Sequence, residues 1–260
     1  MDKKSLAQKK LWILDMDGTV YLGNQLFPET LPFLQRIRES GASYLFFTNN
    51  ASRAKDTYVT RLNGMGIPAG PENILTSAET TIAFLKQHRP GKSVYVVGTP
   101  DLIRSFEDAG ICVEEDAPIV VASFDTTLTY DKLEKACRYI REGAEFISTH
   151  PDFNCPVEGG FIPDSGAICA LITASTGKLP RYFGKPYEDT LQIIKEFSGV
   201  AREDMVVVGD RLYTDIALAD NSPMCSILVL SGESKVEDIG TMPGDPDLIF
   251  KDLSEIIEYL

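Results

Sequence analysis

The stretch Leu11–Thr19, LWILDMDGT, most constrains the fold of this chain, because an apolar run ends there abruptly in two carboxylates. Its first four residues are typical of a buried strand, and Asp15 and Asp17 follow directly. In an open α/β sheet, ligands bind at the carboxyl ends of the strands, and Gly18 lets the chain turn away there without a Cβ clash. The stretch therefore predicts a buried strand with a ligand-binding or catalytic site at its carboxyl end.

Two carboxylates at this spacing supply hard oxygen ligands, which suit Mg²⁺. A calcium-binding EF-hand loop also begins with D-x-D, but it needs a glycine at its sixth position and an acid at its twelfth. Val20 and Leu26 occupy these positions here, which excludes an EF-hand. A turn with two solvated aspartates remains the alternative until other residues join the pattern.

The charge of the chain limits its partners. The net charge is −13 with a pI near 4.6, which disfavours binding to nucleic acid and to anionic membranes, so any phosphate must be held locally. Hydrophobic residues make up 43% and charged residues 24% of the 260 residues, as in ordinary globular proteins. This length accommodates a core domain and a second, smaller domain.

Neither a leader nor a membrane span is predicted. The basic start, MDKKSLAQKK, is followed by four apolar residues before Asp15, too few for the core of a signal peptide. The five cysteines are odd in number and contain no C-x-x-C pair, which indicates reduced thiols and argues against structural zinc. We therefore expect a cytoplasmic protein.

Apolar runs and helical stripes alternate along the chain, which predicts an α/β fold. Further core strands are expected at 44–47, 205–208, 226–230 and 248–250, with helices at 28–40, 54–65 and 187–197 and another from near Asp215 through Asp220. After Arg89-Pro90-Gly91 a separate rhythm of strands and helices begins, which predicts an inserted α/β domain over about residues 83–180. The core domain is then formed by residues 1–82 and 181–260.

The inserted segment ends in a stretch rich in proline and glycine, residues 149–167, which we expect to be a long loop. His150 and Asp152 in this loop are candidates for ligand contacts, and the alternative is that they serve only as turn and cap residues.

Each expected core strand that has a polar signature has it at its carboxyl end. Asp15 and Asp17 follow the first strand, Thr48 the second, and Asp210 another, with Asp215 five residues later. Two unit charges about 4 Å apart repel by roughly 4 kcal/mol at an effective dielectric near 20. Converging acids therefore need a cation, and Mg²⁺ fits a site made of oxygen ligands.

This pattern resembles a known family. D-M-D-G-T, a strand ending in Thr48, Lys185 before Pro186, and G-D with an acid five residues later resemble the four motifs of the haloacid dehalogenase superfamily. The insertion between the second and third motifs resembles its large, C2-type cap. The strings SFDTTLTYDKL and GGFIPDSGA are similar to those of the NagD-like, or 4-nitrophenylphosphatase, subfamily. The resemblance implies a Rossmann-like, doubly wound parallel sheet with a smaller inserted α/β cap.

The resemblance also implies roles for the matched residues. Asp15 is the expected nucleophile, which forms an aspartyl-phosphate, and Asp17 is the expected general acid and base. The residues expected to bind the phosphoryl group are Thr48, Asn49, Asn50 and Lys185. The metal ligands expected for Mg²⁺ are Asp15, the Asp17 carbonyl and Asp210, with Asp215 supporting the metal through water or from behind these ligands.

The expected activity is Mg²⁺-dependent hydrolysis of small phosphomonoesters, such as sugar phosphates, nucleoside monophosphates and 4-nitrophenyl phosphate. Asp17 argues against a dehalogenase, which has no alkoxide to protonate. A phosphomutase on the same core and a non-catalytic regulator that binds phosphorylated metabolites remain alternatives. The family often has asparagine where this chain has His150, so no cap residue is assigned. Pairing of caps into a homo-oligomer is left open.

Overall fold

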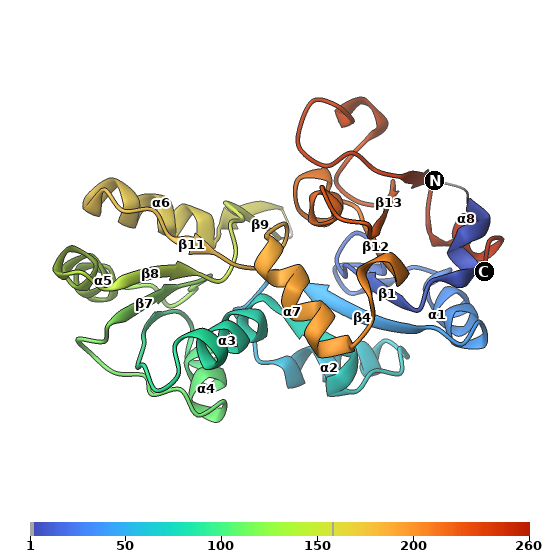
Figure 1. Ribbon diagram of the computed structural model, residues 1–260. Coiled ribbons are helices and arrows are strands. Elements are labelled where there is room, and N and C mark those ends of the chain that lie inside the picture. Colours follow the sequence, from blue (N-terminus) through green and yellow to red (C-terminus); the bar gives the residue numbers. More distant parts are fainter. Residues whose placement is uncertain (1–2, 158) are drawn as a thin grey trace. The chain divides into compact units, whose positions relative to one another are not determined.

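The computed structural model describes residues 3–157 and 159–260 (Figure 1). Met1, Asp2 and Glu158, which the predicted domains include, lie outside the described residues. The chain forms two compact units. The first unit comprises Met1–Thr48, Val59–Leu75 and Leu191–Leu260, and the second comprises Asn49–Tyr58 and Thr76–Thr190.

The first unit is built on a six-stranded sheet in the order β14-β13-β12-β1-β4-β5. β1 pairs in parallel with both β12 and β4. The later strands are added on both sides of β1, with β4 and β5 on one side and β12, β13 and β14 on the other. This is the doubly wound α/β arrangement that the sequence predicted. Its strands are β1 (Leu11–Leu14), β4 (Ser43–Thr48), β5 (Ile74–Thr76), β12 (Met205–Gly209), β13 (Cys225–Val229) and β14 (Leu248–Phe250).

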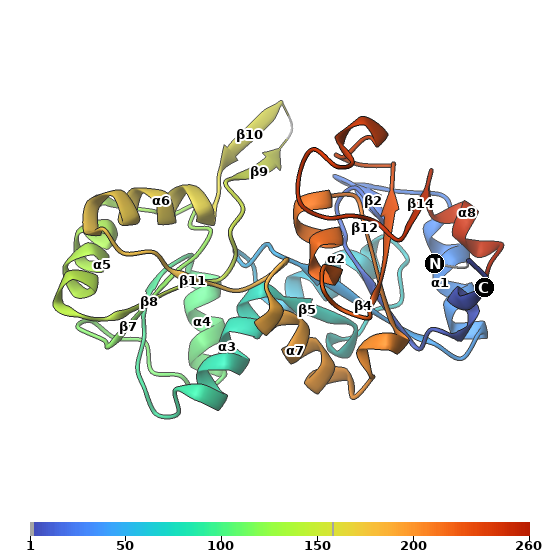
Figure 2. The ribbon, with the colours of Figure 1, turned by 45° about the horizontal axis from the view of Figure 1, so that its top comes forward.

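Both faces of the six-stranded sheet are covered. Successive side chains of each strand point to opposite faces, so neighbouring residues of β1 pack against different helices. On one face Trp12 packs edge-on against Phe33 of α1 (Thr30–Glu39), with ring centroids 5.4 Å apart. On the other face Ile13 belongs to a buried cluster that includes Leu191 of α7 (Glu188–Ser198). Figures 1 and 2 show α1 beside α8 (Leu253–Ile257).

The second unit contains a smaller parallel sheet in the order β11-β8-β7-β6. Its strands are β6 (Tyr95–Val97), β7 (Ile119–Ala122), β8 (Glu145–Ser148) and β11 (Arg181–Tyr182). The helices α5 (Tyr130–Glu142) and α6 (Ser165–Thr176) bury one face of this sheet, through a cluster that contains Val120, Ile140 and Ile172. Figure 2 shows α3 (Ser77–His88) and α4 (Pro100–Asp108) on the other side of β7 and β8.

Short elements complete the two units. They are the hairpin β2 (Tyr21–Leu22) and β3 (Gln25–Leu26), the helix α2 (Lys55–Gly64), and 3-10 turns at Lys3–Gln8, Pro71–Asn73, Arg202–Asp204, Ala217–Ala219 and Val236–Asp238. The helix expected near Asp215 is instead a π-helical turn, Leu212–Ile216, followed by one of these 3-10 turns.

The expected long loop over residues 149–167 is partly wrong. It contains an antiparallel pair of strands, β9 (Asn154–Val157) and β10 (Gly160–Pro163), and the first turn of α6. The described residues of these two strands are exposed or half-buried on both faces, so they show no alternation of apolar and polar residues. The sequence therefore carries little signal for a strand there.

The boundaries of the two compact units differ from the predicted cap boundaries, residues 83 and 180. The main segment of the second unit is Thr76–Thr190. One reason is that β11, placed with the core by the sequence, pairs with β8 of the four-stranded sheet. Another is that α3 begins at Ser77 and lies wholly in the second unit. That residues 83–180 form an independent cap stays a prediction.

Candidate active site

The carboxyl ends of neighbouring strands in the first unit carry the predicted acidic residues. Asp15 directly follows β1, and its N–H donates to the Val208 carbonyl of β12, with 3.0 Å between the atoms. Asp210 directly follows β12, whose residues lie in register with those of β1. Because the two strands are parallel and adjacent, these acids reach the same edge of the sheet.

Asp15, Asp210 and Asp215 form a group in which one carboxylate oxygen of each lies within 4.8 Å of the others. Asp210 and Asp215 are buried, with 2% and 1% exposure, and Asp15 is half-buried. At this separation and an effective dielectric near 20, each ionised pair repels by roughly 3 to 4 kcal/mol. The sequence predicted that Asp15 and Asp210 meet at this edge, together with Asp17, which is not part of the group, and that Asp215 supports the metal.

Glycines make room for the carboxylates. A Cβ on Gly209 would lie 2.2 Å from the Asp215 Cβ, and a Cβ on Gly18 would lie 2.4 Å from Asp210 Oδ2. Both distances are shorter than real Cβ contacts allow, and Gly18 also has a positive φ of 93°. Glycine at these positions therefore lets the backbone of β12 and the turn after β1 approach the acids.

The surroundings of Asp210 oppose its ionisation. Burial, followed by the charges of Asp15 and Asp215, raises the pKa of Asp210 to about 8. The charge of Arg211 and the N–H of Glu233, which donates to Asp210 Oδ2 at 2.7 Å, act in the opposite direction. The contacts with Arg211 and Glu233 do not outweigh burial and the repulsion by the two acids, so the pKa of Asp210 stays raised.

The donor set fits a divalent cation. Within residues 3–157 and 159–260, Asp210 Oδ1 is buried and has no hydrogen-bond partner. Such a buried oxygen is costly unless an ion or water compensates it. Asp15 and Asp210, with Asp215 in support, would supply carboxylate oxygens, which are the ligands that Mg²⁺ prefers.

Two other predicted residues, Asp17 and Thr48, belong to the first unit. The Asp17 carboxylate is half-buried, accepts from the Gly23 N–H at 3.4 Å, and is not part of the three-acid group. Thr48 is the last residue of β4, which pairs with β1, and is half-buried.

The remaining predicted residues belong to the second unit. The Asn49 side chain contacts both backbone groups of Lys185: its Oδ1 accepts from the Lys185 N–H at 2.7 Å, and its Nδ2 donates to the Lys185 carbonyl at 3.0 Å. Asn50 Oδ1 accepts from the Ser52 N–H at 3.0 Å. Lys185 itself is buried, with 2% exposure, and precedes a cis peptide bond to Pro186.

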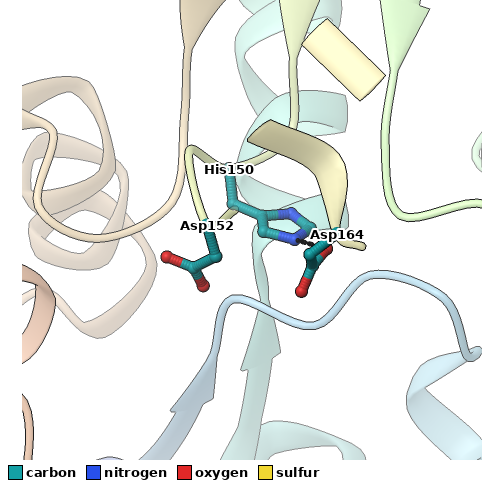
Figure 3. A group of neighbouring side chains, drawn as sticks. All are labelled: His150, Asp152 and Asp164. Atoms are coloured by element: carbon teal, nitrogen blue, oxygen red, sulfur yellow. Dashed lines mark hydrogen bonds and ion pairs between the residues drawn. The ribbon is translucent and has the colours of Figure 1, made fainter. Parts of the chain in front are cut away.

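His150, Asp152 and Asp164 form a second close group, in the second unit (Figure 3). His150 is fully buried, and its Nε2 lies 2.8 Å from Asp164 Oδ1. Its Nδ1 lies 2.8 Å from Thr149 Oγ1, so both ring nitrogens have partners. Asp164 also caps α6 by accepting from the Ser165 N–H. These contacts support an internal role for His150 rather than a ligand contact.

Sequence reasoning missed two contributors to the acid group. The loop after β13 donates to Asp210 from the Glu233 N–H, and a Cβ on Gly232 would lie 2.0 Å from Asp210 Oδ2. Arg211 is the second contributor, and its Nε pairs with Glu233 at 2.9 Å. The signal that could have found this loop is the pair of small residues, Ser231 and Gly232, close after the end of a parallel strand.

Family models match two parts of the chain. The model described as haloacid dehalogenase-like hydrolase matches residues 12–112, and the model described as HAD-hydrolase-like matches residues 182–256. An acid sugar phosphatase of Staphylococcus aureus (strain MRSA252) is 35% identical over 257 residues, which cover 98% of this chain and 99% of the relative. The chain belongs to the haloacid dehalogenase-like hydrolases.

Solved structures of this family share the fold. The 4-nitrophenylphosphatase of Thermotoga maritima is 42% identical, with a TM-score of 0.93 and coverage of 97% of this chain and 98% of that one. NagD of E. coli K-12 is 32% identical, with a TM-score of 0.88 and coverage of 95% and 98%. The predicted NagD-like resemblance, the α/β fold class and the prediction of a phosphatase of this family are confirmed.

None of the helices in the described part of the chain combines the length and the apolar composition that crossing a membrane requires.

Proposed function

We propose that this hydrolase releases phosphate from small phosphomonoesters in a Mg²⁺-dependent reaction with an aspartyl-phosphate intermediate. The observation that carries the proposal is the grouping of Asp15 with two buried carboxylates at the edge of a parallel sheet. Asp15 is the most exposed of the three, which suits a nucleophile that must reach a substrate.

In the first step, a carboxylate oxygen of Asp15 attacks the phosphorus, and the bond between the phosphorus and the ester oxygen breaks. Asp17 donates a proton to the departing alkoxide. Its carboxylate lies outside the three-acid group, which keeps it available for proton transfer. The products of this step are the free alcohol and phosphorylated Asp15.

In the second step, Asp17 accepts a proton from a water molecule whose oxygen attacks the phosphorus. The bond between the phosphorus and the Asp15 oxygen breaks, which releases inorganic phosphate and restores both aspartates. One residue thus serves first as an acid and then as a base, because the proton that it gives to the alcohol is replaced in each cycle by a proton from the attacking water.

Charge on the transferred group must be balanced while an anion attacks an anion. When bound by Asp15, the Asp17 carbonyl and Asp210, with Asp215 in support, Mg²⁺ supplies that positive charge. Thr48, Asn50 and Lys185 are proposed to hold the phosphoryl oxygens, whereas the side-chain amide of Asn49 is already engaged with the Lys185 backbone. The burial of Lys185 supports this role, because a cation attracts an anion more strongly away from water.

We propose sugar phosphates as the first substrates to test, since the curated relative of S. aureus is named an acid sugar phosphatase. Nucleoside monophosphates come next, and 4-nitrophenyl phosphate is the convenient reporter. The net charge of −13 supports a small phosphorylated partner rather than nucleic acid. Cytoplasmic location and pairing through the cap stay predictions, and the five free cysteines of the described residues agree with a reducing compartment.

The test is phosphate release from 4-nitrophenyl phosphate and from a panel of sugar phosphates, with Mg²⁺ or with EDTA. Asp15→Asn should lower turnover by at least about 10⁴-fold, since it removes the nucleophile. Asp108→Asn, the same change at an exposed position at the end of α4, is the matched control and should retain turnover.

Retained turnover in a folded Asp15→Asn variant would contradict the assignment of the nucleophile. Release that persists in EDTA would contradict the metal dependence. Phosphate transfer that needs an added bisphosphate would identify a mutase, and tight binding without turnover would identify a regulator.

A further inference from the structure

The side chain of Asn49 and the backbone of Lys185 form a paired contact in the second unit. The amide of Asn49 accepts from the Lys185 N–H at 2.7 Å and donates to the Lys185 carbonyl at 3.0 Å, as one peptide group pairs with another. Asn49 is 6% exposed and Lys185 is 2% exposed, so water does not compete for these bonds. A residue 136 positions away thus fixes the backbone on both sides of the Lys185 Cα.

Asn49 is itself fixed by its neighbours. Its Nδ2 also lies 3.2 Å from Asp152 Oδ2, and its backbone carbonyl accepts from Ser77 Oγ at 2.5 Å. Gly184 brings the chain close to this amide: a Cβ there would lie 2.6 Å from Asn49 Oδ1 and 3.0 Å from the Thr149 carbonyl. The amide of Asn49 therefore has one position that satisfies all of these contacts.

The loop that carries Asp152 is anchored on the start of α6 (Figure 3). The Asp152 carbonyl accepts from the Gly166 N–H at 2.8 Å, and a Cβ on Gly166 would lie 2.1 Å from the Pro151 carbonyl. The contact between His150 Nε2 and Asp164 Oδ1 joins the same loop to the N-cap of α6. Asp152 is thus a fixed partner for Asn49 rather than a mobile surface acid.

We propose that Asn49 is a positioning residue, whose side chain holds Lys185 for the reaction and does not itself contact the phosphoryl group. The inference rests on the proposed function, from which it takes the role of Lys185. A lysine side chain has four rotatable bonds, so its charge is placed accurately only when its backbone is fixed. The amide of Asn49 fixes that backbone. The amide is in turn fixed by Asp152, whose loop is anchored by the contact between His150 and Asp164.

A double-mutant cycle tests this positioning role. Asn49→Ala should lower kcat/KM by about 30-fold, within the range typical of residues that orient a functional group. Lys185→Ala removes the ammonium but keeps the backbone groups that Asn49 contacts. In the Lys185→Ala background, Asn49→Ala should therefore cost less than about 3-fold, because the group it positions is gone.

Asn63→Ala is the matched control. The Asn63 amide also donates to two backbone carbonyls, those of Val59 and Ala69 at 2.8 Å each, but it is exposed and belongs to the first unit. It should change kcat/KM by less than about 2-fold, as surface substitutions usually do.

A readout independent of turnover is hydrogen exchange at the Lys185 N–H, followed in the peptide that contains Phe183 to Tyr187. Asn49→Ala removes its acceptor and should speed this exchange by at least about 10-fold, whereas Asn63→Ala should not change it. Asn49→Asp keeps an acceptor for the N–H but loses the donor to the carbonyl. It serves as the second variant if Asn49→Ala does not fold, and it should also lose activity.

The outcomes separate the two claims. If Lys185→Ala retains wild-type activity, the proposed role of Lys185 is wrong. If Lys185→Ala is impaired while Asn49→Ala and Asn49→Asp remain fully active, the positioning role alone is wrong. An equal loss from Asn49→Ala in both backgrounds would mean that Asn49 acts independently of Lys185, as a direct phosphate contact would, and would overturn the inference.

Discussion

The two units each contain a crowded group of three ionisable side chains, and the two groups differ in how their charge is balanced. In the first unit, Asp15, Asp210 and Asp215 are all acids, and within the described residues the buried Asp210 Oδ1 has no hydrogen-bond partner. In the second unit, His150 lies between acids, and both of its ring nitrogens have partners. The first group needs a cation from outside, whereas the second supplies its own.

This difference agrees with the proposal that the first group is a site for chemistry and the second holds a loop in place. Repulsion among the three acids is a cost that the folded protein bears until a cation binds, and such unbalanced charge is typical of functional sites. The His150–Asp164 contact is internally satisfied and fixes a loop. Neutralising an acid of the first group should therefore raise the stability of the metal-free protein and lower its activity. Replacing a residue of the second group should mainly lower stability.

Asp210→Asn is the change with the largest expected effect. Turnover should fall by at least about 10³-fold, because a charged metal ligand is lost. In EDTA at pH 8.5, where Asp210 of the wild type is ionised, the melting temperature should rise by about 2–6 °C, since the repulsion of Asp210 by Asp15 and Asp215 is removed in a protein of this size. The amide oxygen can still accept from the Glu233 N–H, so the fold is not otherwise disturbed.

Activity assays and thermal melts in EDTA measure both effects, with Asp108→Asn as the exposed control. A variant that melts below the wild type in EDTA would show that the acids do not repel one another in the metal-free protein.

His150→Asn should have a smaller effect, on stability, with an expected loss of about 1–3 kcal/mol from a broken buried hydrogen bond. Burial alone lowers the pKa of His150, but the charge and hydrogen bond of Asp164, with the charge of Asp152, raise it above its ordinary value. The stabilisation from this pair is therefore fully present below the ordinary pKa of histidine, about 6.5, and is lost as the pH rises through the raised pKa.

Denaturant unfolding at pH 6 and at pH 8.5 tests this dependence. The loss caused by His150→Asn should be larger at pH 6, while His88→Asn, at the exposed end of α3, should show no such difference. A larger loss at pH 8.5 would mean that His150 is held in its neutral form.

Elements with a strong local pattern were predictable from the sequence. The strand Leu11–Leu14 has the expected bounds, because a continuous apolar run that stops at Asp15 defines it. The strands β9 and β10 were missed, since their residues are exposed or half-buried on both faces and carry prolines and glycines.

The acid group was predictable for a topological reason, and the contacts of Asn49 were not. Asp15 and Asp210 each follow an apolar strand, and parallel neighbouring strands bring their ends together. The pairing of Asn49 with the Lys185 backbone joins residues 136 positions apart through a side-chain amide, for which the sequence has no periodic signal. Sequence reasoning grouped both residues around phosphate but did not indicate that one holds the other.

The most direct test of the unbalanced acid group is the effect of Mg²⁺ on the melting temperature of the wild-type protein at pH 5.5 and pH 8.5. Because the pKa of Asp210 is raised to about 8, its contribution to the stability of the metal-free protein is lost as the pH rises from about 4 to about 8. Mg²⁺ at 100 times its dissociation constant adds about 2.7 kcal/mol. We predict a larger Mg²⁺-induced rise at pH 8.5 than at pH 5.5, and none in Asp210→Asn. An unchanged melting temperature at pH 8.5, or an equal rise in Asp210→Asn, would contradict the account.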